Sequence, residues 1–282
     1  MKYSRSLLRL VLIFTLVLGV GSCKEKKMNN NPIHTNKSAA EFLGNPEYRA
    51  ISYGGYRTLT REDQPSLSQI KEDLKILSAI GIKVVRTYNL QLDQAQNILK
   101  AIRDLKSEDA GFEMYVMLGA WIDCQGAWTQ SGPNHDIEDL ENNTSEIAKA
   151  IALANQYPEI VKIIAVGNEA MVHWATSYFV KPAVILKWVS YLQTQKAKGN
   201  LPELLWITSS DNFASWGGGG PEYHNEDLKK LIATVDYISL HTYPFHDTHY
   251  NNNFWLVPQQ EFSGTENEII EKAMQRALHY AI

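Results

Sequence analysis

The stretch IIAVGNEA, residues 163–170, begins with four apolar residues and places Asn168 and Glu169 directly after a glycine. A continuous apolar run is typical of a strand buried on both faces, as in a parallel sheet covered by helices. Where such strands close into a barrel, their carboxyl ends meet at one open mouth. The stretch therefore predicts a buried parallel strand whose last two residues would reach that mouth if the sheet closes into a barrel.

The rest of the chain repeats the pattern of strand followed by helix. Runs rich in β-branched and aromatic residues predict strands at 48–56, 82–89, 112–122, 161–169, 203–213 and 236–245. Apolar residues at helical spacing predict helices at 68–81, 92–106, 145–156, 184–199, 225–235 and 265–282. The alternation predicts an α/β fold with a parallel sheet and crossover helices.

Two parallel architectures fit this alternation, a doubly wound sheet and an eight-stranded barrel. No glycine-rich fingerprint follows the first strand, and polar or aromatic residues gather at the ends of several strands. Both observations favour the barrel. We therefore expect a (β/α)8 TIM barrel, of which about six βα units are present.

The first residues predict export and a lipid anchor. Residues 1–23 combine a basic start with an apolar run over residues 10–20, which is typical of a signal peptide. VGSC at 20–23 resembles the lipobox of bacterial lipoproteins, which implies lipidation of Cys23 and attachment to the outer membrane or cell surface of a bacterium. Residues 24–45 are polar and rich in Asn, which predicts a flexible tether before a domain at 46–282.

Composition narrows the class of partner. The 282 residues are 44% hydrophobic, enough for one large domain, and removal of three basic leader residues takes the net charge from −4 to −7. This balance offers no basic face for nucleic acid. Without Cys23 only Cys124 remains, so no internal disulfide is expected. His241, His246 and His249 lie in a strand end and loop rather than in the spacing of metal ligands, so we expect no metal. We also expect no cofactor, and we expect the protein to be a monomer.

Glu169 is the strongest candidate for chemistry. A Glu at a strand end is also compatible with a solvated loop or the start of a helix. Here an Asn precedes it, an apolar run lies behind both, and aromatic residues end the neighbouring strands. These surroundings predict a partly desolvated carboxylate that keeps its proton near neutral pH and serves as a general acid.

Five segments resemble glycoside hydrolase family 17, the β-1,3-glucanases, in order along the chain. They are ISYGGYR at 51–57, RTYN at 86–89, VGNE at 166–169, TSSDNFASW at 208–216 and HTYPF at 241–245. The resemblance implies a retaining barrel glycosidase with Glu169 as acid/base, Asn168 on the sugar 2-hydroxyl and Tyr243 beside the nucleophile. It further implies substrate-binding roles for Tyr53, Tyr88, Trp121 and Asp211.

A retaining glycosidase needs a second carboxylate, the nucleophile, about 5 to 5.5 Å from the first. In the resembled family it ends a seventh strand, and no matching motif occurs here. Glu261, Glu266 and Glu268 lie in a polar loop or at a helix start, where Glu is ordinary. We therefore expect the nucleophile beyond residue 282, and the 282-residue chain to be inactive and a C-terminally truncated piece.

Other functions remain open at this point. A catalytically dead, surface-displayed protein would use the aromatic residues and Asn168 to bind glucan without cleaving it. A barrel enzyme of different linkage specificity, or a β-glucan transglycosylase, would carry the same acid. The leading hypothesis is hydrolysis of laminarin-type β-1,3-glucans.

Overall fold

The computed structural model describes residues 37–243, together with 265, 267–268, 271–272 and 275. The predicted signal peptide, the lipidation site Cys23, residues 24–36 of the predicted tether and most of the last predicted helix lie outside the described residues. The account below concerns residues 37–243 unless another residue is named.

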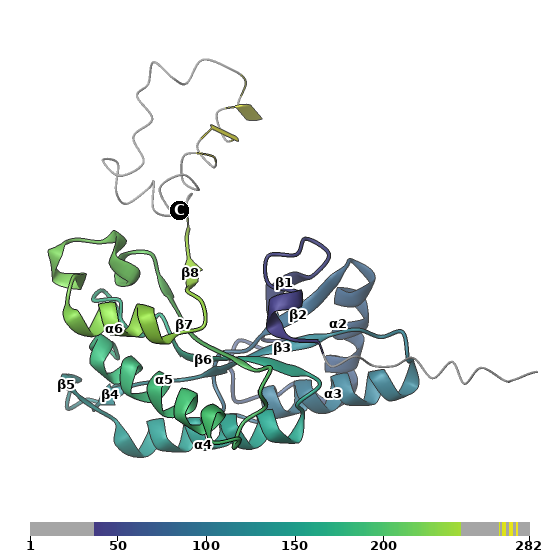
Figure 1. The fold of residues 1–282 in the computed structure, drawn as a ribbon. Coiled ribbons are helices and arrows are strands. Elements are labelled where there is room, and N and C mark those ends of the chain that lie inside the picture. Colours follow the sequence, from purple (N-terminus) through teal and green to yellow (C-terminus); the bar gives the residue numbers. More distant parts are fainter. Residues whose placement is uncertain (1–36, 244–264, 266, 269–270, 273–274, 276–282) are drawn as a thin grey trace, which may run out of the picture. The chain divides into compact units, whose positions relative to one another are not determined.

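Six parallel strands form one curled sheet (Figure 1). They are β1 (Arg49–Ser52), β2 (Ile82–Arg86), β3 (Tyr115–Ala120), β6 (Val161–Asn168), β7 (Trp206–Asn212) and β8 (Ser239–His241). Their order in the sheet is the order along the chain, β1-β2-β3-β6-β7-β8, with every neighbouring pair parallel. The α/β fold and all six predicted strands are confirmed, and the curled sheet is consistent with part of a barrel.

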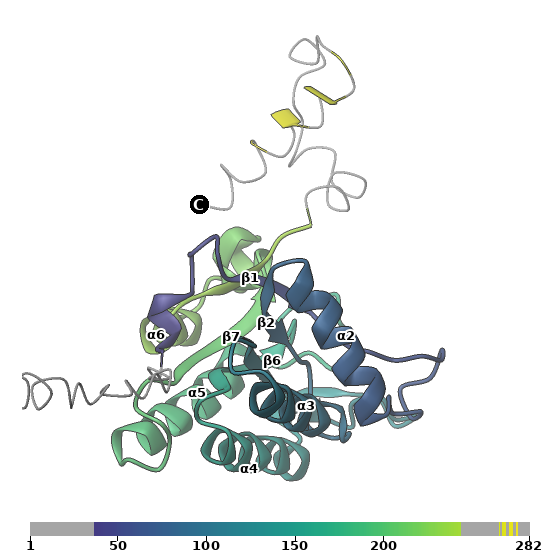
Figure 2. The ribbon, with the colours of Figure 1, turned by 90° about the vertical axis from the view of Figure 1, so that its right-hand side faces the viewer.

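Helices α2, α3, α4 and α5 lie along one face of the sheet (Figures 1 and 2). The bounds are α2 (Leu67–Ala79), α3 (Gln94–Glu108), α4 (Leu140–Gln156), α5 (Pro182–Ala197) and α6 (Glu226–Thr234). Side chains cap several of them, as where Ser66 and Gln69 form a capping box at the start of α2. Their apolar faces and the sheet share one buried core. Within the described ranges, no helix has the length and apolarity needed to cross a membrane.

The predicted tether is wrong for residues 37–45. A 3-10 turn, η1 (Ala39–Glu41), is followed by Phe42, and both Ala39 and Phe42 are buried. The Phe42 ring stacks on Tyr115 of β3 at 5.1 Å between centroids. The folded unit therefore begins earlier than composition suggested, because two apolar residues in a polar segment suffice to attach it to the sheet.

A short antiparallel pair interrupts the repeat between β3 and α4 and was not predicted. It consists of β4 (Cys124–Gln125) and β5 (Asn134–Glu138). Two backbone hydrogen bonds attach it to the loop after β6, from Cys124 N to Tyr178 O (3.4 Å) and from Trp128 N to Ser177 O (3.2 Å). Two short helices, η2 (Ala214–Gly218) and η3 (Pro221–Tyr223), follow β7.

Gly119 lets β3 approach the end of β2 closely. A Cβ atom at this position would lie 2.4 Å from the Thr87 carbonyl oxygen and 2.9 Å from the Tyr88 backbone. The Gly119 N–H donates to Thr87 Oγ1 at 3.1 Å, which fixes the same contact. The absence of a side chain at Gly119 therefore allows the backbone of Thr87 and Tyr88, just after β2, to lie directly against β3.

Candidate active site

A cavity of about 520 Å³ lies at the carboxyl ends of β1, β2, β6 and β8. Its lining consists of Ser52, Arg86, Tyr88, Asn168, Glu169, Leu240, His241, Thr242 and Tyr243. Four of the predicted site residues, Tyr88, Asn168, Glu169 and Tyr243, therefore meet at one place although they are far apart in sequence. Glu169 is the only carboxylate in this lining.

The backbone at the end of β6 turns sharply to present Glu169. Gly167 has φ +80° and Glu169 has φ +47°, and the pairing of β6 with β7 shifts register between Ala165 and Asn168. The Glu169 N–H donates to the Ser210 carbonyl at 2.8 Å, which holds the turn. A positive φ at a residue other than Gly or Asn is uncommon and is often found at functional sites.

The Glu169 carboxylate is hydrogen-bonded by two neighbours. Its Oε1 lies 2.9 Å from His241 Nδ1 and accepts from the Tyr243 hydroxyl at 3.0 Å. The bond with His241 lowers the pKa of Glu169, burial opposes this, and Tyr243 and Arg86 lower the pKa further. The expectation of a proton held near neutral pH is therefore wrong for the residues described, because hydrogen bonds to the charged form outweigh its desolvation.

His241 is a site residue that the sequence did not assign. Its Nε2 lies 3.0 Å from Ser210 Oγ, which in turn lies 2.8 Å from Ser239 Oγ. Because Ser210 occupies one ring nitrogen, the other is directed at Glu169. The segment HTYPF contained His241, and its place at the end of a predicted strand was the available signal.

Arg86 is a second unassigned residue, at the last position of β2. Its guanidinium donates to Asn168 Oδ1 and lies over the Tyr88 ring, 5.0 Å from the centroid. Burial lowers the pKa of Arg86, and the charge of Glu169 opposes this. A charged residue that ends an apolar strand, as in IKVVR at 82–86, was the signal.

Tyr53, a predicted substrate-binding residue, does not line the cavity. Its side chain is buried, and its hydroxyl donates to Asp73 Oδ2 of α2 at 2.7 Å. Burial, followed by this bond, raises the pKa of Tyr53. The ring therefore joins β1 to α2 on the helix side of the sheet rather than at the mouth.

Asp211, another predicted substrate-binding residue, also lies outside the cavity lining. Its side chain is fully buried, and it accepts backbone bonds from Met171 N (2.8 Å) and Asn212 N (2.7 Å). Burial raises the pKa of Asp211 to about 6, and the two backbone donors oppose the shift. Asp211 thus holds the segment that follows Glu169, because Met171 is only two residues further on.

Trp121, the remaining predicted binding residue, follows β3 outside the cavity lining. It is half-buried, and its indole donates to Asp123 Oδ1 at 2.6 Å. Its ring lies 5.2 Å from that of Tyr178, in the loop after β6. Trp121 therefore lies at the same edge of the sheet as Glu169 but does not line the cavity with it.

The three carboxylates weighed as a nucleophile gain no support. Glu261 and Glu266 lie outside the described residues. Glu268 Oε2 accepts from the Thr265 N–H at 2.7 Å, a bond typical of a helix start. Across the described parts of the chain, no group of three or more His, Cys, Asp or Glu side chains is arranged to hold a metal ion.

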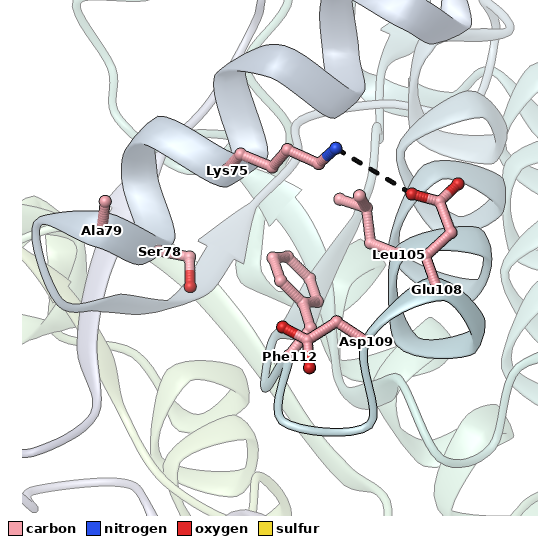
Figure 3. A pocket seen from close by; sticks show the side chains of 7 residues that line it. All are labelled: Lys75, Ser78, Ala79, Leu105, Glu108, Asp109 and Phe112. Atoms are coloured by element: carbon pink, nitrogen blue, oxygen red, sulfur yellow. Dashed lines mark ion pairs between the residues drawn. The ribbon is translucent and has the colours of Figure 1, made fainter.

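A second cavity, of about 480 Å³, lies between the carboxyl-terminal parts of α2 and α3 (Figure 3). Lys75 and Glu108 pair across it at 3.9 Å, and Glu108 also pairs with Lys71 at 2.9 Å. These helix ends lead into β2 and β3, so the cavity is at the amino ends of the strands. Active sites of barrels lie at the other end of the strands.

Known proteins resemble this chain in sequence and fold. The crystal structure of an endo-laminarinase from Formosa Hel1_33_131 is 62% identical, with a TM-score of 0.81, over 87% of this chain and 62% of that one. The chain thus spans about 62% of that relative's length. A β-1,3-glucanase and allergen of Cryptomeria japonica pollen is 15% identical over 73% of this chain and 58% of its own, with a TM-score of 0.48. A comparison with curated proteins found no match.

The family model covers most of the chain, including every element that lines the cavity except the first residue of β1. Residues 50–272 match the BtgE/BtgC glycoside hydrolase domain. The chain therefore belongs to the BtgE/BtgC glycoside hydrolase family.

Proposed function

We propose that this protein is a retaining glycosidase that hydrolyses laminarin-type β-1,3-glucans, with Glu169 as the acid/base and a mechanism like that of glycoside hydrolase family 17. The observation that carries the proposal is the meeting of Glu169, Asn168 and Tyr88 in one cavity at the carboxyl ends of the strands. The 62% identity to an endo-laminarinase supports the choice of substrate.

Arg86 gives Asn168 a defined orientation in this proposal. Because Asn168 Oδ1 accepts from the guanidinium, the amide N–H₂ is the group left to donate into the cavity. A donor at that place suits the sugar 2-hydroxyl, whose hydrogen bond strengthens as the ring approaches the oxocarbenium ion. Asn168 would thus stabilise the transition state more than the bound substrate.

The acid role requires that Glu169 be protonated when the glycosidic oxygen leaves. In a retaining pair the nucleophile is a second carboxylate about 5 to 5.5 Å away, and its negative charge raises the pKa of the acid. We place this nucleophile outside residues 37–243, since the cavity lining holds only one carboxylate. The lowered pKa of Glu169 given above reflects only the described residues, and the charge of the nucleophile would raise it.

Replacement of Tyr243 by Phe should shift the pH profile. The Tyr243 hydroxyl donates to the Glu169 carboxylate and lowers its pKa, so its loss should raise that pKa. An acid catalyst works only while protonated, and its activity falls as pH rises through the pKa. The alkaline limb of kcat/KM should therefore move to higher pH. A Tyr191→Phe variant on α5 should leave the limb in place, and an unmoved limb in Tyr243→Phe would exclude Glu169 as the acid.

The substrate class is tested with a panel of polysaccharides. The active enzyme should release reducing sugar from laminarin at least about tenfold faster than from a β-1,4-glucan or a β-1,6-glucan. Faster release from the β-1,4-glucan or the β-1,6-glucan would be consistent with a glycosidase but would overturn the proposed β-1,3 specificity. Accumulation of products longer than the substrate would instead indicate transglycosylation.

We further propose that the mature protein is held at the cell envelope by lipid on Cys23, as the lipobox-like VGSC suggests. One acyl chain gives only marginal membrane binding, whereas the several chains of a lipoprotein anchor it stably. Labelling of growing cells with palmitate tests this: the label should appear in the protein and disappear in a Cys23→Ser variant.

A further inference from the structure

Three aromatic side chains lie together at the carboxyl edge of the sheet and have no role in the mechanism above. Trp121 follows β3, Trp128 lies in the turn between β4 and β5, and Tyr178 lies in the loop between β6 and α5. The Tyr178 ring stacks on Trp128, with centroids 4.9 Å apart and planes at 21°, and lies 5.2 Å from Trp121. We call these three residues the aromatic row.

One acidic residue holds both tryptophans. Asp123 is only 5% exposed and accepts from the Trp121 indole N–H at 2.6 Å. Burial raises the pKa of Asp123 to about 6, and hydrogen bonds from the Trp121 and Trp128 side chains oppose that shift. A buried carboxylate shared by two indoles fixes the rings, since their only polar donors are both directed at it.

The backbone also keeps Trp128 in place. This residue has φ +62°, which is strained for a residue with a bulky side chain, and its N–H donates to the Ser177 carbonyl at 3.2 Å. Its side chain nevertheless remains 63% exposed. The strained backbone of Trp128 thus costs free energy, and because most of the ring remains in solvent, its burial does not offset that cost.

One member of the aromatic row, Tyr178, lies near Glu169, because the Val180 N–H two residues further on donates to the carbonyl of Ala170 at 2.7 Å. After burial, the charge of Glu169 is the next cause that raises the pKa of Tyr178, to about 12. The cavity around Glu169 is lined from β1, β2, β6 and β8, whereas the row comes from the segments after β3 and β6. In the sheet order, β3 lies between β2 and β6, so the row adds the segment after β3 to the strand ends that line the cavity.

We propose that the aromatic row is an additional sugar-binding subsite, which takes one pyranose ring of a linear β-glucan chain at a distance from the bond that is cleaved. The proposal rests on the proposed glycosidase function. A flat, exposed indole suits the C–H face of a pyranose, and fixed rings lose little entropy on binding. A chain must be long enough to reach from Glu169 to Trp128, so the row favours longer oligosaccharides.

The test compares two substrate lengths in Trp128→Ala. For laminarihexaose, kcat/KM should fall about tenfold through a higher KM, while for laminaritetraose it should change less than about twofold. Trp128→Phe keeps a flat ring and should recover most of the loss. Tyr191→Ala removes an aromatic side chain that is 43% exposed on α5 and should leave both substrates unchanged. An equal loss on both substrates, or no loss on either, would overturn the subsite.

Binding separates this proposal from the proposed function. In a Glu169→Gln background, calorimetry with laminarihexaose should give a Kd about tenfold higher when Trp128 is Ala than when it is Trp. An unchanged Kd would reject the subsite whatever the activity. Retained hydrolysis by Glu169→Gln would reject the acid/base role, while a raised Kd in the same experiment would still support the aromatic row.

Discussion

Replacement of Glu169 by Gln is expected to lower kcat/KM on laminarin by about 10³-fold. The amide keeps the shape of the side chain but cannot donate a proton to the leaving oxygen, and general acid catalysis contributes about 10² to 10⁴-fold. The loss should appear in kcat, because Asn168, Tyr88 and Arg86 remain to bind sugar. Reducing-sugar release at several laminarin concentrations measures both constants.

The matched control for this variant is Glu203→Gln. Glu203 is exposed and lies just before β7, at the opposite end of the strands from the mouth. Its replacement should leave kcat/KM unchanged. A Glu169→Gln enzyme that kept more than about a tenth of the activity would exclude the acid role. A wild-type protein that holds the second carboxylate and binds laminarin without cleaving it would favour a surface glucan-binding protein.

Replacement of Asp211 by Ala is expected to destabilise the protein by about 3 kcal/mol. The carboxylate is fully buried and accepts the N–H groups of Met171 and Asn212. Its removal leaves these donors without their acceptor, at about 1 to 3 kcal/mol for a buried donor. Since Met171 follows Glu169 closely, kcat should also fall about 10²-fold as the acid shifts. Urea unfolding and laminarin kinetics measure the two effects.

The pH dependence of stability gives a second readout at Asp211. Its pKa is raised to about 6 in the folded protein, above the ordinary 3.8, so the folded state binds the proton more tightly. The unfolding free energy should therefore decrease as pH rises from about 4 to about 6. Asp211→Asn keeps one acceptor and removes the titration, so its stability should fall less over this window. An identical slope in both proteins would contradict the raised pKa.

The strands and helices could be predicted because buried faces require apolar residues at a spacing that differs between strands and helices. The run at 163–166 has apolar side chains on both faces, as a strand buried on both sides requires. The β4–β5 pair could not be predicted, since NHDIE at 134–138 has exposed, polar positions. Its attachment depends on Ser177 and Tyr178, about 40 residues further along the chain.

Site residues could be predicted where the position of a residue at the end of a strand was enough to place it at the mouth. Asn168 and Glu169 reach the mouth because β6 ends there. Tyr53 directly follows β1 and Asp211 lies near the end of β7. Successive side chains of a strand point to opposite faces, so a one-residue difference decides whether a side chain lines the mouth or is buried. Arg86 and His241 act through side chains on other strands, so their roles became visible only when β2, β6 and β8 were seen together.

The most direct test of the central claim, that Glu169 is the acid/base of a retaining enzyme, is the configuration of the product formed by Glu169→Gly with azide. Gly suits the φ of +47° and leaves space for the anion. With a β-glucoside whose leaving group needs no acid, azide should restore turnover, and NMR should show a β-glucosyl azide, because the anion displaces an intact nucleophile. An α-glucosyl azide would instead make Glu169 the nucleophile and contradict the account.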